Sequence, residues 1–203
     1  MTYTDPTIMI DDAGFGCPVG GMIVAGYRPQ TKQFEWALVS VGHFQSPDFD
    51  RKGYHLGALQ ATQVVLQKLK ADKTADVIHI CQGEPHKATH EWLQSKGWNW
   101  QAVKVQGELQ GLIETQLKEY LASLGFAYHG STEQYGLLFW SAIRWLKGGD
   151  VNRRGMDEEK IKQAKSGWES FRFYCDLPYA EAKAASKQNK ARQSFQRWQD
   201  PDD

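Results

Sequence analysis

The 203-residue sequence has little of what would place it in a specialised class of protein. Its three cysteines, Cys17, Cys81 and Cys175, are far apart and form no Cys-x-x-Cys pair, so neither a disulfide framework nor a zinc knuckle is predicted. There is no apolar run of about 18 residues, so no membrane-spanning helix is expected. The N-terminus has no basic segment followed by an apolar core, so no secretory signal is expected and a cytoplasmic, reducing location fits best.

A net charge is also lacking, because 24 basic residues balance 24 acidic ones. A protein that coats nucleic acid over its whole surface would carry a basic excess, so this class is disfavoured, whereas a local basic patch is compatible with the balance. Apolar residues, by contrast, make up 41% of the chain, and eight of its residues are tryptophan. This composition is typical of a chain that folds around a core, and its length suffices for one domain with a helical appendage.

The hydrophobic pattern predicts three strands first, and helices that alternate with strands afterwards. Short loops join the first three strands, which are therefore antiparallel neighbours, whereas helical crossovers lead to later, parallel strands. The result is an α/β fold with a mixed five-stranded sheet flanked by helices. Strands are expected at 7–10, 22–27, 34–42, 76–81 and 98–105, helices at 54–70, 85–96, 108–124 and 132–147, and loops at 13–21 and 45–53.

The composition changes after Asp150. Residues 151–197 hold eleven Lys and Arg against six Asp and Glu, whereas residues 1–150 hold thirteen against fifteen. We interpret residues 1–150 as the domain and residues 151–203 as a helical, basic and aromatic extension. The extension either holds a nucleic-acid backbone or packs as an amphipathic helix on the domain or on another subunit. The basic side chains concerned are Lys183, Lys187, Lys190, Arg192 and Arg197.

Four acidic residues stand at the ends of predicted strands. Asp11 and Asp12 end the first strand, and Glu84 and Glu108 each follow a later strand by three residues. Asp11, Glu84 and Glu108 are expected to converge at one edge of the sheet, and a turn starting at Asp12 would bring its side chain in as well. Converging carboxylates repel one another unless a cation binds, and oxygen ligands suit Mg²⁺ or Mn²⁺. The pattern thus predicts a two-metal hydrolase site, although each acid also has a structural explanation in turns or helix N-termini.

Other candidate sites have weaker support. His86 and His90 are four residues apart next to Glu91, but they lack a third ligand, so surface histidines are expected in preference to a zinc site. Cys81 has no evident His–Asp partners and is expected to be a small buried apolar residue. A phosphate loop of the actin-like ATPase kind at residues 11–14 would need two such halves, and the chain is too short and has no repeat.

The segment 10–25, Ile-Asp-Asp-Ala-Gly-Phe-Gly-Cys-Pro-Val-Gly-Gly-Met-Ile-Val-Ala, resembles the opening motif of type 2 ribonuclease H. The segment 105–108, Val-Gln-Gly-Glu, is similar to that family's Lys-Gly-Asp before a helix, and residues 81–84 fall where the family has Val-Asp-Gly. The absence of acids from the helix 54–70 favours type 2 over type 1. The resemblance implies a ribonuclease H-like fold in which Asp11, Asp12 and Glu108 bind Mg²⁺ or Mn²⁺ for cleavage of RNA in RNA–DNA hybrids.

Two positions depart from the family pattern. Gln82 stands where the third acid is expected and cannot be an anionic ligand, so Glu84 would have to substitute for it. Phe15 replaces the arginine of the family's Gly-Arg-Gly loop, while Gly14 and Gly16 remain and can present backbone N–H groups to a phosphate or 2′-hydroxyl. Phe15 either stacks on a base or packs beneath the loop. Two functions therefore remain open: a metal-dependent nuclease, and an inactive relative that binds nucleic acid or protein.

Overall fold

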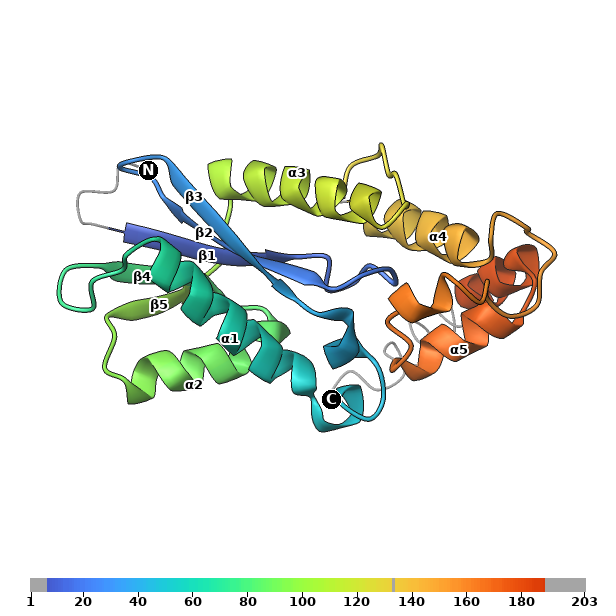
Figure 1. The fold of residues 1–203 in the computed structure, drawn as a ribbon, viewed down its shortest axis with the longest axis horizontal. Helices are drawn as coiled ribbons and strands as arrows, with labels where there is room; N and C mark the ends of the chain where they lie inside the picture. The colour runs from blue at the N-terminus through green and yellow to red at the C-terminus, as the bar shows by residue number, and fades with distance from the viewer. Residues whose placement is uncertain (1–6, 133, 189–203) are drawn as a thin grey trace.

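The computed structural model describes residues 7–132 and 134–188, and a five-stranded sheet in the order β3-β2-β1-β4-β5 runs through its centre (Figure 1). β1 pairs antiparallel with β2, and β2 with β3, whereas the β1–β4 and β4–β5 pairs are parallel. This confirms the predicted α/β fold with a mixed sheet of three antiparallel and then parallel strands. The strands are β1 (Thr7–Ala13), β2 (Met22–Arg28), β3 (Gln33–Val39), β4 (Val77–Cys81) and β5 (Trp100–Val103).

Helices cover both faces of the sheet. α1 (Gly53–Lys68) and α2 (Lys87–Ser95) lie on one face, and α3 (Glu108–Ser123) lies on the other (Figure 1). Side chains alternate along β1, so that Ile8 and Ile10 join the core under α1 while Met9 joins the core under α3. Within the described ranges, no helix combines the length and the apolar character that crossing a bilayer requires.

Short 3₁₀ helices occupy places where the sequence predicted the end of a strand, a loop or a regular helix. η1 (Val41–Phe44) begins inside the strand predicted at 34–42, which ends at Val39 in β3, and η2 (Phe49–Arg51) interrupts the loop predicted at 45–53. η3 (Glu84–His86) precedes α2, where the pattern predicted one continuous helix from Pro85. The turn η3 matters for the site, because it sets the direction of the side chains that follow β4.

The first strand is longer than predicted. The sequence indicated its end at Ile10, but pairing with β2 continues to Ala13, opposite Ile23. Parallel pairing with β4, in contrast, stops at the Ile10–Ile80 pair. Beyond Ile10 the strand is therefore held from one side only, and its other side is open.

The extension after Asp150 packs, as far as residue 188, on the same core as α3. Ala164, Phe171 and Cys175 are buried in the cluster that also contains α3. This agrees with the packing interpretation of the extension, while Lys190, Arg192 and Arg197 lie outside the described residues. The helices here are α4 (Tyr135–Leu146), η4 (Ile161–Gln163), α5 (Glu169–Asp176) and a further helical stretch over residues 179–188.

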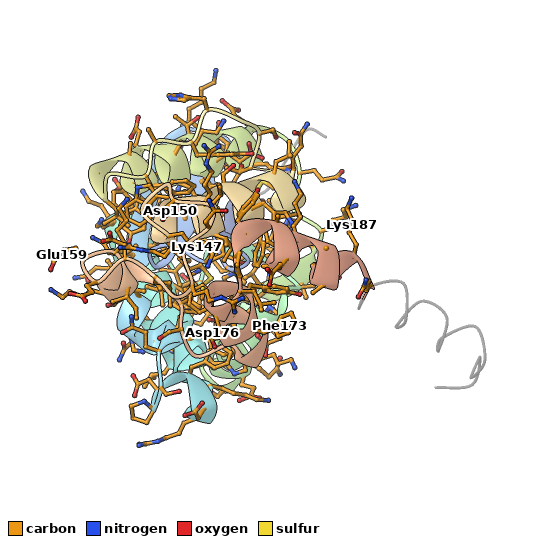
Figure 2. The ribbon with its side chains drawn as sticks, turned by 90° about the vertical axis from the view of Figure 1, so that its right-hand side faces the viewer. Lys147, Asp150, Glu159, Phe173, Asp176 and Lys187 are labelled. Carbon is orange, nitrogen blue, oxygen red and sulfur yellow. The ribbon has the colours of Figure 1, made fainter. Side chains whose placement is uncertain are left out.

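Lys147, directly after α4, is buried and connects the loop after α4 with the end of α5 (Figure 2). Its fully buried ammonium donates hydrogen bonds to the carbonyl oxygens of Arg153, Cys175 and Leu177, at 3.1, 2.6 and 2.7 Å. Burial lowers the pKa of Lys147, and the carbonyl oxygens compensate for its lost hydration. The loop after α4 is thereby fixed to the end of α5.

Gly26 in β2 marks a close approach of α1 to the sheet. A Cβ atom at this position would lie 2.5 Å from Val65 Cγ1 and 2.8 Å from Leu69 Cδ1. We expect Gly26→Ala to lower the free energy of unfolding by about 1–3 kcal/mol, because α1 has to move outward. Gly111→Ala in α3, with no atom within 4 Å of the added Cβ, should instead raise it by about 0.5–1 kcal/mol. Urea denaturation measures both, and an unchanged Gly26→Ala variant would contradict the close packing.

Candidate functional site

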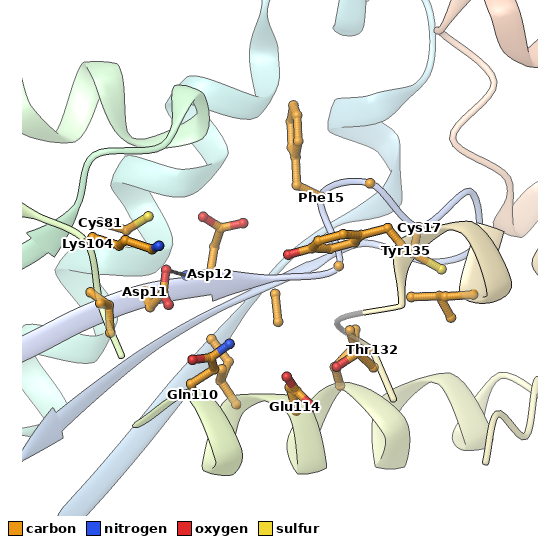
Figure 3. A pocket seen from close by; sticks show the side chains of 17 residues that line it. Asp11, Asp12, Phe15, Cys17, Cys81, Lys104, Gln110, Glu114, Thr132 and Tyr135 are labelled. Atoms are coloured by element: carbon orange, nitrogen blue, oxygen red, sulfur yellow. Dashed lines mark hydrogen bonds between the residues drawn. The ribbon is translucent and has the colours of Figure 1, made fainter. Parts of the chain in front are cut away.

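Asp11 and Asp12 lie in β1 just where β4 stops pairing with it. Successive side chains of a strand point to opposite faces, so Asp11 continues the α3-facing row of Met9 and Asp12 the α1-facing row of Ile10. Both nevertheless line one cavity, because no neighbouring strand covers this edge (Figure 3). The sequence therefore placed the two acids together correctly, although they lie within the strand rather than in a turn.

The cavity beside the two acids has a volume of about 480 Å³, which is in the range of ligand-binding clefts. It is bounded by β1 and the glycine-rich loop after it, by the end of β4 and by α3 (Figure 3). The exposed Lys104, directly after β5, adds a positive charge. The polar side chains of the lining are Asp11, Asp12, Cys81, Lys104, Gln110, Glu114, Thr132 and Tyr135.

Cys81, the last residue of β4, forms a group with the two acids. One ligand atom from each of the three residues lies within 4.8 Å of the other two. The Gly83 N–H donates to Cys81 Sγ at 3.3 Å, and the Asp12 N–H donates to Asp11 Oδ1 at 2.9 Å. The expectation of a buried, purely apolar Cys81 is thus corrected, because its thiol is only partly buried and faces carboxylates.

The titration of this group is perturbed by its surroundings. Burial and the charge of Asp12 raise the pKa of Asp11 from 3.8 to about 6. Burial and the charge of Asp11 raise the pKa of the Cys81 thiol to about 12. A bound cation stabilises the ionised forms of such groups, so its binding would lower both pKa values and release protons.

His86 lies against Asp12 and is fully buried, which corrects the expected surface position. Its Nε2 is 3.2 Å from Asp12 Oδ1, yet neither ring nitrogen has hydrogen-bond geometry toward any described residue. His90 is different, because its Nε2 lies 3.0 Å from the Cys81 carbonyl oxygen and its ring stacks on Trp100. The spacing of the two histidines was visible in the sequence, but the turn η3 that buries the first was not.

Glu84 does not join the two acids. It is the first residue of η3, and its Oε1 accepts a hydrogen bond from the Tyr54 hydroxyl at 2.9 Å and lies 2.8 Å from His55 Nε2. Burial and the Glu84 carboxylate raise the pKa of Tyr54 to about 12, so this hydroxyl keeps its proton. Neither Glu84 nor Gln82 lines the cavity of Asp11 and Asp12.

Glu108 also lies outside the cavity. It is the exposed first residue of α3, and burial together with the Glu108 carboxylate raises the pKa of the Tyr27 hydroxyl in β2 to about 12. In β2, the residue opposite Asp11 is Ala25. Tyr27 lies two residues further along the same face of this strand, a distance of about 7 Å. Further along α3, Gln110 and Glu114 line the cavity instead. Their four-residue spacing on one helical face was the signal that could have identified them.

The loop after β1 carries the three residues that the resemblance assigned to substrate binding. Gly14 has a φ of 92°, and a Cβ atom there would lie 2.8 Å from Leu117 Cδ1, so the position requires glycine. Gly16 is exposed, with no atom within 4 Å of an added Cβ. The partly buried ring of Phe15 contacts the Tyr54 ring at a centroid distance of 5.4 Å, which favours packing beneath the loop over stacking on a base.

Lys165 anchors this loop from the extension. Its fully buried ammonium donates hydrogen bonds to the carbonyl oxygens of Gly14 and Phe15 and lies 4.1 Å from the centroid of the Phe44 ring. The backbone N–H of Lys165 also donates to the Pro18 oxygen at 2.8 Å. Burial lowers the pKa of Lys165 from 10.5 to about 7. This role could not be predicted from the sequence, because nothing local distinguishes Lys165 from the other lysines of the extension.

No family model matches the chain, and no curated protein matches it either. The resemblance to type 2 ribonuclease H therefore stays a prediction from the motif at residues 10–25. Beyond this motif, the structure shows an α/β fold with its strand order, and a group of Asp11, Asp12 and Cys81 that could hold a metal ion.

Proposed function

We propose that the protein is a divalent-metal-dependent nuclease that hydrolyses phosphodiester bonds in nucleic acid, with RNA–DNA hybrids as the substrate class that the resemblance implies. The observation that carries the proposal is the adjacent pair Asp11 and Asp12, facing one cavity at the open edge of the central strand. Two neighbouring, partly buried carboxylates are unfavourable without a cation. Carboxylates alone would select Mg²⁺ or Mn²⁺.

The residues around the cavity fit the needs of such a reaction. Asp11 and Asp12 would hold the metal, which supplies an activated water and stabilises the charge that develops on the leaving oxygen. Lys104 offers a positive charge to the phosphate backbone. Gly16 lets that backbone approach closely, and Tyr135, 73% exposed at the start of α4, can stack on a base or sugar.

A cleavage assay with a chelator control tests this proposal. We expect the full-length protein to cleave a labelled RNA–DNA hybrid when Mg²⁺ or Mn²⁺ is present, and cleavage to stop when EDTA removes the metal. Single-stranded RNA, double-stranded RNA and double-stranded DNA in parallel reactions identify the preferred substrate. If none of these nucleic acids is cleaved with any divalent ion, the protein is not a nuclease.

A second candidate function, a nucleic-acid or protein binding module without catalysis, is favoured by the positions of the remaining acids. Gln82 replaces one expected acid, and Glu84 and Glu108 lie outside the cavity. In this case wild type and Asp11→Asn bind a hybrid with equal affinity, with or without metal, and no products form. Fluorescence anisotropy on the same labelled hybrid distinguishes this outcome from cleavage.

A further inference from the structure

The donors that the fold gathers around Asp12 differ from those of a magnesium site. The Cys81 thiol lies close to the carboxylates of Asp11 and Asp12, and the His86 imidazole lies against Asp12. Mg²⁺ takes oxygen ligands, whereas thiolate and imidazole are typical ligands of Zn²⁺ and of ions close to it. The donor set therefore indicates a different class of metal from the one that the acids alone predict.

His86 supplies an observation independent of the acidic group. Its side chain has 0% exposure, and both ring nitrogens lack a hydrogen-bond partner among the described residues. A buried polar group left unpaired is costly, and native proteins rarely leave one without a reason. A metal ion at Nε2 would remove the cost at that atom, because coordination uses its lone pair, whereas Nδ1 would still lack a hydrogen-bond partner among the described residues.

The spacing of neighbouring donors is close to that of ligands of one ion, and His86 meets the group of Asp11, Asp12 and Cys81 through Asp12. Zn²⁺ binds nitrogen and oxygen at about 2.0–2.2 Å, so tetrahedral geometry places two such donors about 3.4 Å apart. His86 Nε2 and Asp12 Oδ1 are 3.2 Å apart without hydrogen-bond geometry. The atoms of Asp11, Asp12 and Cys81, within 4.8 Å of one another, need to contract by up to about 1.4 Å to reach the same spacing.

We propose that Asp12 and His86, together with Asp11 and Cys81, form a binding site for a borderline divalent transition ion, of the class of Zn²⁺ and Co²⁺, in preference to Mg²⁺. This inference rests on the proposed function in one respect, namely that the ion is the one that supports hydrolysis. Its binding can be measured without any nuclease assay, so the two proposals are separable.

The test is a titration of the full-length, metal-free protein with Co²⁺ alone and with Zn²⁺ alone. Wild type is expected to give a thiolate-to-cobalt charge-transfer band that saturates at one ion, that Zn²⁺ displaces and that excess Mg²⁺ does not. Cys81→Ser should abolish the band, and His86→Gln should weaken Zn²⁺ binding by about tenfold or more. Cys17→Ser, a thiol lining the same cavity, and His129→Gln, an exposed histidine, serve as controls that keep wild-type binding.

Two results overturn the site: a cobalt spectrum without the sulfur band, or unchanged Zn²⁺ affinity in both Cys81→Ser and His86→Gln. If the buried His86→Gln variant does not fold, X-ray absorption of the Zn²⁺-loaded wild type decides instead. One sulfur at about 2.3 Å and at least one imidazole are expected, and an oxygen-only shell refutes the proposal.

Cleavage assays on the same samples separate the two proposals. Mg²⁺-supported cleavage by a protein without a Zn²⁺ site refutes this inference and leaves the nuclease standing. Zn²⁺ bound through Cys81 and His86, without cleavage in any metal, refutes the nuclease and leaves the site standing.

Discussion

Asp11→Asn is expected to abolish hydrolysis and, at the same time, to stabilise the fold. The amide keeps the size of the side chain and an oxygen that can still accept the Asp12 N–H. It removes one of the two negative charges that we propose to hold a cation, and a metal ion contributes several kcal/mol to the stabilisation of the transition state. A loss of that size corresponds to a fall in rate of about 10³-fold or more.

The stability gain follows from the raised pKa of Asp11, which moves from 3.8 to about 6 through burial and the charge of Asp12. Cys81 and His86, which also face it, act in the opposite direction. At low pH the group is protonated in both folded and unfolded states, so asparagine offers no advantage. Between pH 3.8 and about 6 the unfolded state releases the proton first, so wild-type stability falls as pH rises. Above that window the variant should be more stable by about 3 kcal/mol.

Urea denaturation of the metal-free proteins at pH 4 and pH 8 measures this difference. Glu119→Gln, which neutralises an exposed carboxylate on α3, is the control and should change neither stability nor activity. Divalent metal should narrow the gap at pH 8, because the cation stabilises the ionised Asp11 of the wild type alone. An active Asp11→Asn variant would remove Asp11 from the site, and an equal stability gain at both pH values would contradict the burial of its charge.

The fold could be predicted because it depends on local signals. The short connections between β1, β2 and β3 require antiparallel pairing, and the helices before β4 and β5 require parallel crossovers. The end of β1 could not be predicted in the same way. Whether a strand continues past Ile10 depends on which neighbour still pairs with it, and that information lies in β2, not in the residues of β1.

The parts of the site that lie in a sequence motif were predicted, whereas the parts that depend on contacts between distant residues were missed. Asp11 and Asp12 were found from their position before the glycine-rich loop. Glu84 was expected at the sheet edge, but the turn η3 directs its carboxylate toward Tyr54 and His55. Lys165 bonds to residues 151 and 150 positions away in sequence, and no local pattern reports such a contact. The strand that carries the acidic pair could thus be predicted from the sequence, whereas the groups that surround it could not.

Lys165→Met is expected to disturb the position of the glycine-rich loop while leaving the stability of the fold nearly unchanged. Methionine keeps most of the apolar stem packed near Phe44 and removes a buried charge, so stability at pH 7 should stay within about 1 kcal/mol of wild type. The carbonyl oxygens of Gly14 and Phe15 lose their donor, and the loop that follows the acidic pair loses its anchor. A misplacement of about 1 Å near reacting groups can cost 10²-fold in rate, so we expect cleavage to fall by about 10- to 100-fold.

The dependence of stability on pH identifies the buried ammonium as the cause. Lys165 has a pKa of about 7 in the folded state and 10.5 as its ordinary value, so between these values the unfolded state binds more protons. Wild-type stability should therefore rise with pH from about 7 upward, and Lys165→Met should lack this rise. Cys17, whose thiol pKa is raised above 9.0 by burial, acts in the opposite direction at higher pH, so the comparison belongs between pH 7 and 8.5.

Two further variants define what the Lys165 result means. Lys165→Ala also removes the buried stem and should cost about 2–3 kcal/mol of stability, which shows how much of the residue's role is packing. Lys162→Met, an exposed lysine three positions earlier, should leave cleavage and the pH dependence unchanged. Full activity in a folded Lys165→Met protein would show that the loop holds its position without the extension. Reduced activity, with preserved stability and no rise of stability with pH, would instead show that residues 151–188 are needed for activity. The only change in this variant is the loss of the hydrogen bonds from Lys165 to the loop after β1.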